Sequence, residues 1–383
     1  MKIVFVSVYL NLHQLPFCLE MRKKLGDDFT YISTAPITQD RIDMGFENMD
    51  EEYDFVIKSY ASPEDSVRAN ELLLEADIAI MGSCPDKMLC DRLNTHKLTF
   101  KYSERYFKGD NSFIDKLRYF YYAKRYIRPL QRKNVFFLCA SAYTSFDVNK
   151  YYDFTGRTFK WGYFRKNTLL DTQKVLDVKE KSSIIWVGRL IDWKHPETVL
   201  EIAERLKNDN ISANIKIIGD GPMKTKLALE IEKRDLSSIV KLIGSITPEA
   251  VQKEMELSQI ALFTSDYKEG WGMVVNEAMN ACCAVVASNA MGAVPFLIKD
   301  GNNGFTYPYN DIELGYLKIR RLLDDFQLAR KVGSNAYKTI TEEWDVSIAV
   351  ERLLILSEKL LLEEKYHCEF ESGPCSIAEP KFS

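Results

Sequence analysis

The chain alternates short, continuously apolar runs with segments in which apolar residues recur every three to four positions. The runs predict buried strands, and the segments predict helices with one apolar face. In the first half, strands are expected over residues 2–8, 29–33, 55–58, 78–81, 98–102 and 135–140. Helices are expected between them over residues 16–25, 67–75 and 86–93.

The second half continues the alternation after a polar run between about residues 160 and 181. Strands are expected over residues 183–187, 214–218, 240–243, 260–264 and 284–287. Helices are expected over residues 196–206, 223–233 and 248–257, from 271–273 onward, and over 316–331 and 345–364. Residues 367–383 contain two prolines, and we expect a poorly ordered end there.

Strands that alternate with helices predict parallel sheets with helices on both faces. A chain of 383 residues is long for a single core, and the polar run at 160–181 is typical of a domain boundary. We therefore expect two α/β domains. Ligands of such sheets bind beyond the C-terminal ends of the strands.

Composition narrows the class of protein. The net charge of −4 gives no general attraction to nucleic acid. The eight cysteines form no CxxC pair and the four histidines are scattered, which argues against a disulfide framework or a metal site. The apolar start of the chain is too short for a signal peptide, and no apolar run reaches the ~18 residues of a membrane span. These features favour a cytoplasmic protein with reduced thiols.

The segment 265–280 carries two acids, Glu269 and Glu277, on either side of a strand-to-helix loop. Gly270 and Gly272 let backbone approach a ligand closely, and a helix start suits an anionic or oxygen-rich group. Carboxylates at both edges can accept hydrogen bonds from ribose or sugar hydroxyls. The alternative is an acidic loop on a solvated face.

Two cations follow the strand at 183–187, in the sequence G-R-L-I-D-W-K-H-P. Arg189 and Lys194 in a loop before a helix predict a diphosphate site, because both can contact phosphate oxygens. Ordinary surface charge is the alternative. The next strand ends in a glycine turn at 219–223, which is a weak signal alone. We expect His195 to be a packing or capping residue.

In the first half, the loops at 7–16 and 103–105 follow strands and are candidate site positions. The segment 113–133 interleaves seven Lys and Arg residues with aromatic residues. It predicts an amphipathic helix for an anionic membrane surface or an anionic acceptor. The alternative is a surface helix with a solvated basic side. Nucleic-acid binding would need further basic stripes.

Residues 181–350 resemble the donor domain of the retaining glycosyltransferases of family 4, which have the GT-B fold. The motifs that carry the resemblance are V-G-R-L and W-K within 187–194, G-D-G-P at 219–222, the Glu269/Glu277 pair, D-G-N-N-G-F at 300–305 and Trp344. The resemblance implies two facing Rossmann-like domains and a final helix that crosses back to the first. The implied domains are 1–165 with 345–383 on the acceptor side, and 166–344 for the donor.

The family's roles carry over where residues match. Arg189 and Lys194 would neutralise the donor's diphosphate, Glu269 would contact the transferred sugar, and Glu277 would hold the ribose hydroxyls. The further donor-binding positions implied by the resemblance are Gly188, Asp220, Gly221, Pro222, Gly270, Trp271, Gly272, Met273, Val274 and Val275. Acceptor-side candidates are His13, Ser103 and Glu104.

The sequence departs from the family pattern in three places. The loop after the first strand contains no glycine, and Ser103 and Glu104 stand where the family often has a histidine facing the donor sugar. Cys282, Cys283 and Ala284 replace the usual Gly-x-Pro after the key helix. The first two departures concern the acceptor side, and the third concerns the wall of the donor pocket.

The resemblance implies a retaining, metal-independent transferase that uses a UDP- or GDP-sugar, needs no cofactor and acts on a glycan, lipid-linked or small-molecule acceptor. Cell-surface polysaccharide or glycoconjugate synthesis is the expected setting, with peripheral contact to the inner face of the membrane through 113–133. Two alternatives remain at this point. One is a nucleotide-sugar epimerase of the same fold, and the other is a catalytically silent nucleotide-sugar-binding protein.

Overall fold

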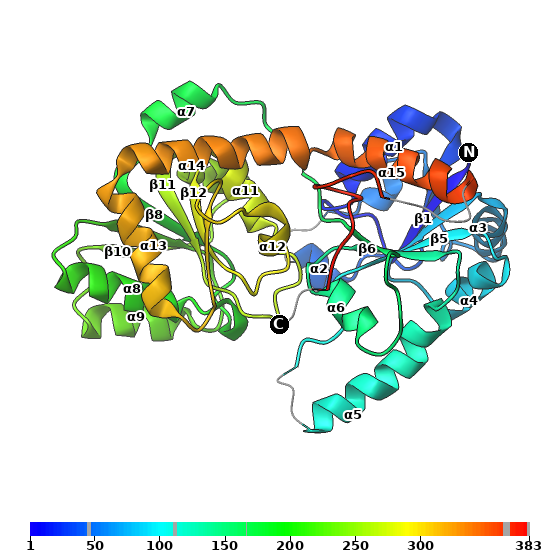
Figure 1. Ribbon diagram of the computed structural model, residues 1–383, viewed down its shortest axis with the longest axis horizontal. Coiled ribbons are helices and arrows are strands. Elements are labelled where there is room, and N and C mark those ends of the chain that lie inside the picture. The colour runs from blue at the N-terminus through cyan, green and yellow to red at the C-terminus, as the bar shows by residue number, and fades with distance from the viewer. Residues whose placement is uncertain (44–46, 110–112, 166, 363–367, 381–383) are drawn as a thin grey trace. The chain divides into compact units, whose positions relative to one another are not determined.

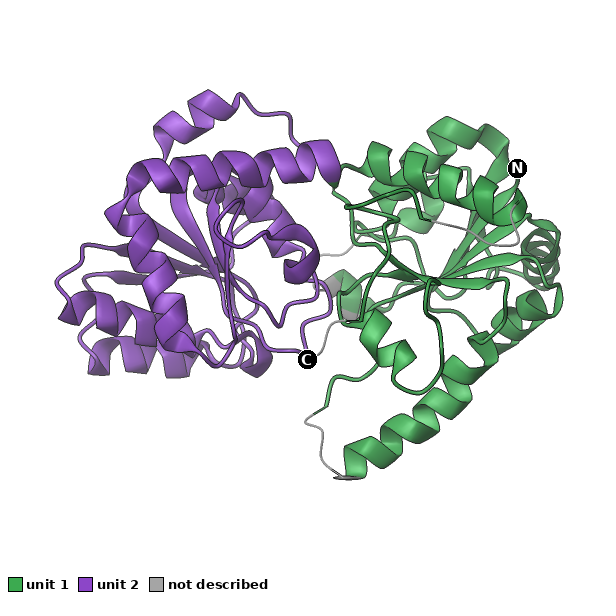
Figure 2. Cartoon of the chain, in the orientation of Figure 1, with its two compact units in different colours: residues 1–166, 344–382 green, residues 167–343, 383 purple. Residues whose placement is uncertain are grey.

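The computed structural model describes residues 1–383 except 44–46, 110–112, 166, 363–367 and 381–383. The chain divides into two compact units (Figure 2). Unit 1 contains residues 1–166 and 344–382, and unit 2 contains residues 167–343.

Unit 1 is built on a seven-stranded parallel sheet in the order β3-β2-β1-β4-β5-β6-β7. Apart from the half-buried β3, its strands are mostly buried, because they are rich in β-branched and aromatic residues that pack on both faces. Their bounds are β1 Ile3–Ser7, β2 Phe29–Ser33, β3 Val56–Lys58, β4 Ile78–Met81, β5 Leu98–Ser103, β6 Val135–Cys139 and β7 Thr158–Lys160.

The helices of unit 1 are α1 Leu15–Leu25, α2 Gln39–Asp43, α3 Pro63–Glu75, α4 Asp86–Asn94, α5 Phe113–Tyr122, α6 Thr144–Asn149 and α15 Val346–Leu362. The final helix, α15, packs against α1 in unit 1. Arg92 on α4 is fully buried and donates to the carbonyl oxygens of Leu73, Ala76, Asp77 and Leu98 at 2.7–3.1 Å. It thereby satisfies carbonyls at the end of α3 that would otherwise lack donors.

The C-terminal segment corrects one expectation. Residues 368–380 are not a poorly ordered end, because residues 375–378 pair antiparallel with β7, with Phe159 opposite Ile377. Backbone hydrogen bonds of 2.7–2.9 Å join Lys160 N to Ser376 O, Cys375 N to Lys160 O and Ala378 N to Thr158 O. Since β7 is the last parallel strand, this segment covers an edge that would otherwise present unpaired backbone groups.

Unit 2 is built on a six-stranded parallel sheet in the order β10-β9-β8-β11-β12-β13. The strands are β8 Glu180–Val187, β9 Asn214–Ile218, β10 Val240–Gly244, β11 Ser258–Phe263, β12 Ala284–Ser288 and β13 Phe305–Tyr307. The helices are α7 Thr172–Val178, α8 Glu197–Asn208, α9 Lys224–Lys233, α10 Pro248–Leu257, α11 Val274–Asn280, α12 Val294–Leu297, α13 Ile312–Asp324 and α14 Phe326–Lys338.

An apolar cluster of unit 2 joins the sheet to α8, α9 and α13, through residues such as Ile184, Val199, Leu227 and Ile319. The predicted single helix over 316–331 is wrong, because α13 and α14 are separated at Asp325. The Asp325 side chain accepts from Leu328 N at 2.9 Å and so begins α14.

Both sheets have a switch point, where the strand order reverses direction. It lies between β1 and β4 in unit 1, and in unit 2 between β8 and β11, which are labelled in Figure 1. Loops that leave adjacent strands at such a point diverge to opposite faces and leave a crevice for a ligand. The predicted fold of two Rossmann-like parallel sheets is confirmed.

Candidate functional site

In unit 2, the two loops that carry most of the predicted donor residues flank the switch point. One follows β8 and carries Arg189 and Lys194, and the other follows β11 and carries Glu269. Lys194 Nζ lies 2.6 Å from Glu269 Oε2, and both side chains are about 15% exposed. The sequence separates these residues by 75 positions, so the sheet topology brings them together.

Hydrogen bonds from neighbouring side chains hold the backbone of Lys194 and the carboxylate of Glu269 in place. Thr264 Oγ1 donates to the carbonyl oxygen of Lys194 and accepts from Trp186 Nε1 at 2.9 Å. Ser265 Oγ donates to Glu269 Oε2 at 3.2 Å. Both of these side-chain hydrogen bonds of Glu269 go to the same oxygen, Oε2. These contacts hold a cation and a carboxylate side by side in fixed positions.

A third loop, which follows β9, is joined to the β8 loop through backbone. Leu190 N donates to Asp220 O at 2.8 Å, and Met223 N donates to Leu190 O at 3.0 Å. Gly221 has a φ of +155°, and a Cβ there would lie 2.5 Å from Leu190 O. Only glycine permits this approach without displacing the neighbouring loop.

The remaining residues of these two loops lie at the surface. Arg189, Asp220 and Pro222 are exposed, whereas Gly188 is partly buried. The Arg189 guanidinium lies 5.8 Å from the centre of the Trp193 ring. Lys224 donates to Asp220 Oδ2 at 2.6 Å, and this hydrogen bond lowers the pKa of Asp220.

The segment from Gly270 to α11 turns sharply. Gly272 has a φ of +88°, which is unfavourable for other residues. Trp271 is buried and donates from Nε1 to Asn276 Oδ1 at 2.9 Å, so it packs inside unit 2. Helix α11 begins at Val274, after Met273, and Val275 is buried. Glu277 is half-buried in the fourth position of this helix.

His195 has a larger role than the sequence suggested. It adopts a left-handed conformation with a φ of +45°. Its Nδ1 lies 3.0 Å from Glu197 Oε1 and its Nε2 lies 3.3 Å from Asp266 Oδ2. The ring stacks on Tyr309 with 6.1 Å between centroids. The hydrogen bonds to Asp266 and then Glu197 raise the pKa of His195 to about 9.

This histidine joins the two loops of the site. Asp266 N also donates to Trp193 O at 2.9 Å, so side chain and backbone both tie the β8 loop to the β11 loop. We call the group of His195, Glu197 and Asp266 the histidine clamp. His195 directly follows Lys194 in the sequence. The sequence did not reveal the clamp because Asp266 is 71 positions away from His195.

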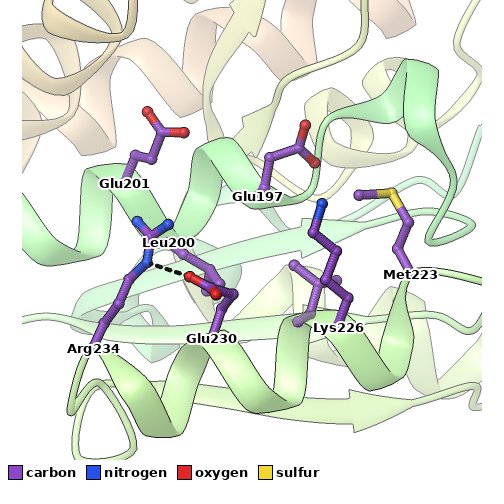
Figure 3. Close-up of a pocket in the computed structure, with 8 residues that line it drawn as sticks. Glu197, Leu200, Glu201, Met223, Lys226, Glu230 and Arg234 are labelled. Atoms are coloured by element: carbon purple, nitrogen blue, oxygen red, sulfur yellow. Dashed lines mark hydrogen bonds and ion pairs between the residues drawn. The ribbon is translucent and has the colours of Figure 1, made fainter.

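A pocket of about 260 Å³ lies between α8 and α9, beside the clamp (Figure 3). Glu197 is part of its wall, and Arg234 is held there by Glu230 at 3.0 Å and by Glu204 at 3.2 Å. None of the predicted site residues lines it. Its lining carries both signs of charge and gives no single ligand class.

In unit 1, the acceptor-side candidates gather at the ends of β1 and β5. The rings of His13 and Tyr163 are 5.4 Å apart, and Tyr163 Oη donates to Glu104 Oε1 at 2.8 Å. Lys108 Nζ donates to the other oxygen, Oε2, at 3.0 Å. Ser103 Oγ donates to the carbonyl oxygen of Glu104 at 2.7 Å. Tyr163 and Lys108 complete the cluster, and no sequence signal marked them.

Among the described residues, no group of three or more His, Cys, Asp or Glu side chains could hold a metal ion. None of the described helices combines the length and apolar character needed to cross a membrane.

One family model matches a part of the chain that lies within unit 2. The family model of glycosyl transferases group 1 matches residues 170–339. The poly(ribitol-phosphate) alpha-N-acetylglucosaminyltransferase of Staphylococcus aureus is 30% identical over 170 residues, which are 44% of this chain and 34% of that protein. The alpha-D-kanosaminyltransferase of Streptomyces kanamyceticus is 29% identical over 175 residues, which are 45% of each chain. The match thus spans less than half the length of these relatives.

Solved structures match almost the whole chain. Anabaena Alr3699/HepE in complex with UDP has a TM-score of 0.68 at 16% identity, over 94% of this chain and 100% of that one. A glycosyltransferase from Rickettsia africae has a TM-score of 0.65 at 15% identity, over 94% and 98%. At these identities the likeness establishes the fold, which is GT-B. Within that fold, residues 170–339 are similar to the glycosyl transferases group 1.

Proposed function

We propose that the chain transfers a sugar from a nucleoside diphosphate sugar to an acceptor, with retention at the anomeric carbon and without a metal ion. One observation carries this proposal: the contact between Lys194 and Glu269 at the switch point of the unit 2 sheet. A cation beside a carboxylate suits a donor that is anionic at its diphosphate and rich in hydroxyls at its sugar.

The basic and acidic residues contact different parts of the donor. Lys194 and Arg189 neutralise the diphosphate, on which negative charge grows as the glycosidic bond breaks. Oε1 of Glu269 accepts from a hydroxyl of the transferred sugar, and Glu277 accepts from the ribose. The acceptor hydroxyl attacks on the face that the diphosphate leaves, and the departing phosphate takes its proton. His13, Ser103 and Glu104 serve the acceptor side from unit 1.

The names of the relatives support the substrate class. They include an N-acetylglucosaminyltransferase and a kanosaminyltransferase, which favours a hexose or amino-hexose donor. The UDP held by the Anabaena structure favours UDP over GDP. A glycan or lipid-linked acceptor fits the poly(ribitol-phosphate) in the name of the Staphylococcus aureus relative. We therefore place the chain in cell-surface polysaccharide or glycoconjugate synthesis.

A donor panel read by release of free nucleotide tests the proposal. Lys194→Ala should lower turnover by about 10²–10³-fold, as loss of a preorganised donor does elsewhere. Lys216→Ala is the matched control, since Lys216 also makes a 2.7 Å ion pair, with Glu254, and is 16% exposed. Equal turnover in the two variants would overturn the assignment of Lys194.

Product analysis separates the alternatives. An epimerase would convert a UDP-sugar to its epimer without any acceptor. A silent binding protein would bind the donor, but wild type would release no more nucleotide from it than the Glu269→Gln variant does. Transfer predicts release that depends on Glu269 and a product whose anomeric configuration matches that of the donor.

A further inference from the structure

Helix α5 of unit 1 has one face that the fold does not cover. Tyr119 and Ala123 are buried, and Ile127 and Leu130 continue this stripe beyond the end of the helix. At 100° per residue, the opposite face carries Ile114, Leu117 and Tyr121. These apolar side chains are 73%, 48% and 69% exposed. Figure 1 shows α5 at the margin of unit 1, beyond its sheet.

Basic residues flank this apolar strip. At 100° per residue Arg118 lies on one side of it, whereas Lys124 and Arg128 follow just beyond the end of α5, and all three are exposed. Residues 113–133 contain seven Lys and Arg residues and one acid, Asp115. The Asp115 side chain is only 17% exposed, and its contact with Arg118 is long, at 3.8 Å. The outward face is therefore strongly cationic around an apolar centre.

We propose that this face binds the surface of a membrane that contains anionic lipids. The helix would lie parallel to the surface, with Ile114, Leu117 and Tyr121 in the headgroup region and the basic side chains against lipid phosphates. A purely anionic polymer would not require the apolar strip. A second copy of the chain would bring two cationic faces together. The strip and the flanking charges together thus favour a lipid surface over these occupants.

The proposal adds a location to the proposed function but does not depend on it. Binding to vesicles and release of nucleotide from a soluble donor are separate measurements. A chain that binds vesicles but releases no nucleotide would retain this inference and remove the proposed function. A chain that releases nucleotide but does not bind vesicles would retain the proposed function and remove this inference.

Vesicle flotation of the full chain tests the surface, with phosphatidylcholine alone and with about 30% phosphatidylglycerol. Each basic residue near an anionic surface contributes roughly fivefold to partitioning. Charge reversal by Arg118→Glu, Lys124→Glu and Arg128→Glu together should therefore weaken binding to the anionic vesicles by at least 100-fold. The matched control reverses three exposed lysines of unit 2, Lys233, Lys241 and Lys338, and should bind at least ten times more tightly than the α5 variant.

A second variant tests the apolar strip. Leu117→Ser with Tyr121→Ser keeps every charge and should weaken vesicle binding about tenfold, while the thermal midpoint stays unchanged because both side chains are exposed. Equal binding by the α5 charge variant and its control would overturn the proposal. A second pair of results would also overturn it: the serine variant binds vesicles as tightly as wild type, and wild type binds polyphosphate as tightly as it binds vesicles. Those results together would indicate that the face binds an anionic polymer.

Discussion

The histidine clamp makes the free energy of unfolding depend on pH in a defined window. The pKa of His195 rises from an ordinary 6.5 to about 9 in the folded chain, through its hydrogen bonds to Asp266 and Glu197. Because the folded state holds this proton more tightly, the contribution is fully present below pH 6.5. It is lost as pH rises through about 9.

The size of the effect follows from the shift. At about 1.4 kcal/mol for each pH unit, the rise corresponds to roughly 3 kcal/mol. The side chain is 29% exposed and solvent screens its ion pairs. We therefore expect about 1–2 kcal/mol in practice.

The perturbation is His195→Asn, because asparagine tolerates a positive φ but does not titrate. Denaturant unfolding at about pH 6 and pH 10 should show wild type losing about 1–2 kcal/mol more than the variant. His96→Asn is the control, since His96 also has a positive φ, of +55°, but is exposed. Parallel losses in wild type and His195→Asn would refute the reasoning.

Three further predictions concern the fold. Gly221→Ala should destabilise by about 1 kcal/mol more than Gly301→Ala in denaturant unfolding, because both have positive φ but only the Gly221 Cβ would lie 2.5 Å from a backbone oxygen, that of Leu190. Equal losses would contradict a steric contribution. Arg92→Met should lower the free energy of unfolding by about 3–5 kcal/mol, because it leaves buried carbonyl oxygens without donors. The control, Arg68→Met, replaces an exposed side chain and should lower it by under about 0.5 kcal/mol. Similar values for the two variants would show that the carbonyl contacts of Arg92 contribute little. Deletion of residues 368–383 should lower the thermal midpoint of unfolding, and it should promote aggregation, measured by light scattering, because it uncovers the edge strand β7. An unchanged midpoint and a monodisperse sample would contradict the role given to this segment.

The order of strands and helices could be predicted because each long element carries its own periodicity. The strands β7 and β13, each of three residues, were missed, whereas the equally short β3 lies within the predicted run 55–58. The break between α13 and α14 depends on one capping side chain, Asp325, inside a continuous apolar pattern. Local sequence also gave no sign that residues 368–380 would pair with β7, because that pairing spans more than two hundred positions.

The candidate site was predictable to the extent that its residues follow strands. Lys194 and Glu269 could be placed at the same sheet edge from that rule, and the structure adds their direct contact. The pairing of His195 with Asp266, and that of Tyr163 with Glu104, depend on loop conformation. A positive φ at His195 cannot be deduced from the residue type, since histidine adopts it in a small minority of cases.

The backbone hydrogen bonds between the β8 and β9 loops have a consequence for the evolution of specificity. Leu190 is joined to Asp220 and Met223 by main-chain atoms alone, whatever side chains the neighbouring positions carry. Exposed positions such as Asp192 and Pro222 can therefore accumulate substitutions while the framework persists. Libraries randomised at such positions should retain folded members at high frequency, which makes these loops a suitable starting point for changing substrate preference by directed evolution.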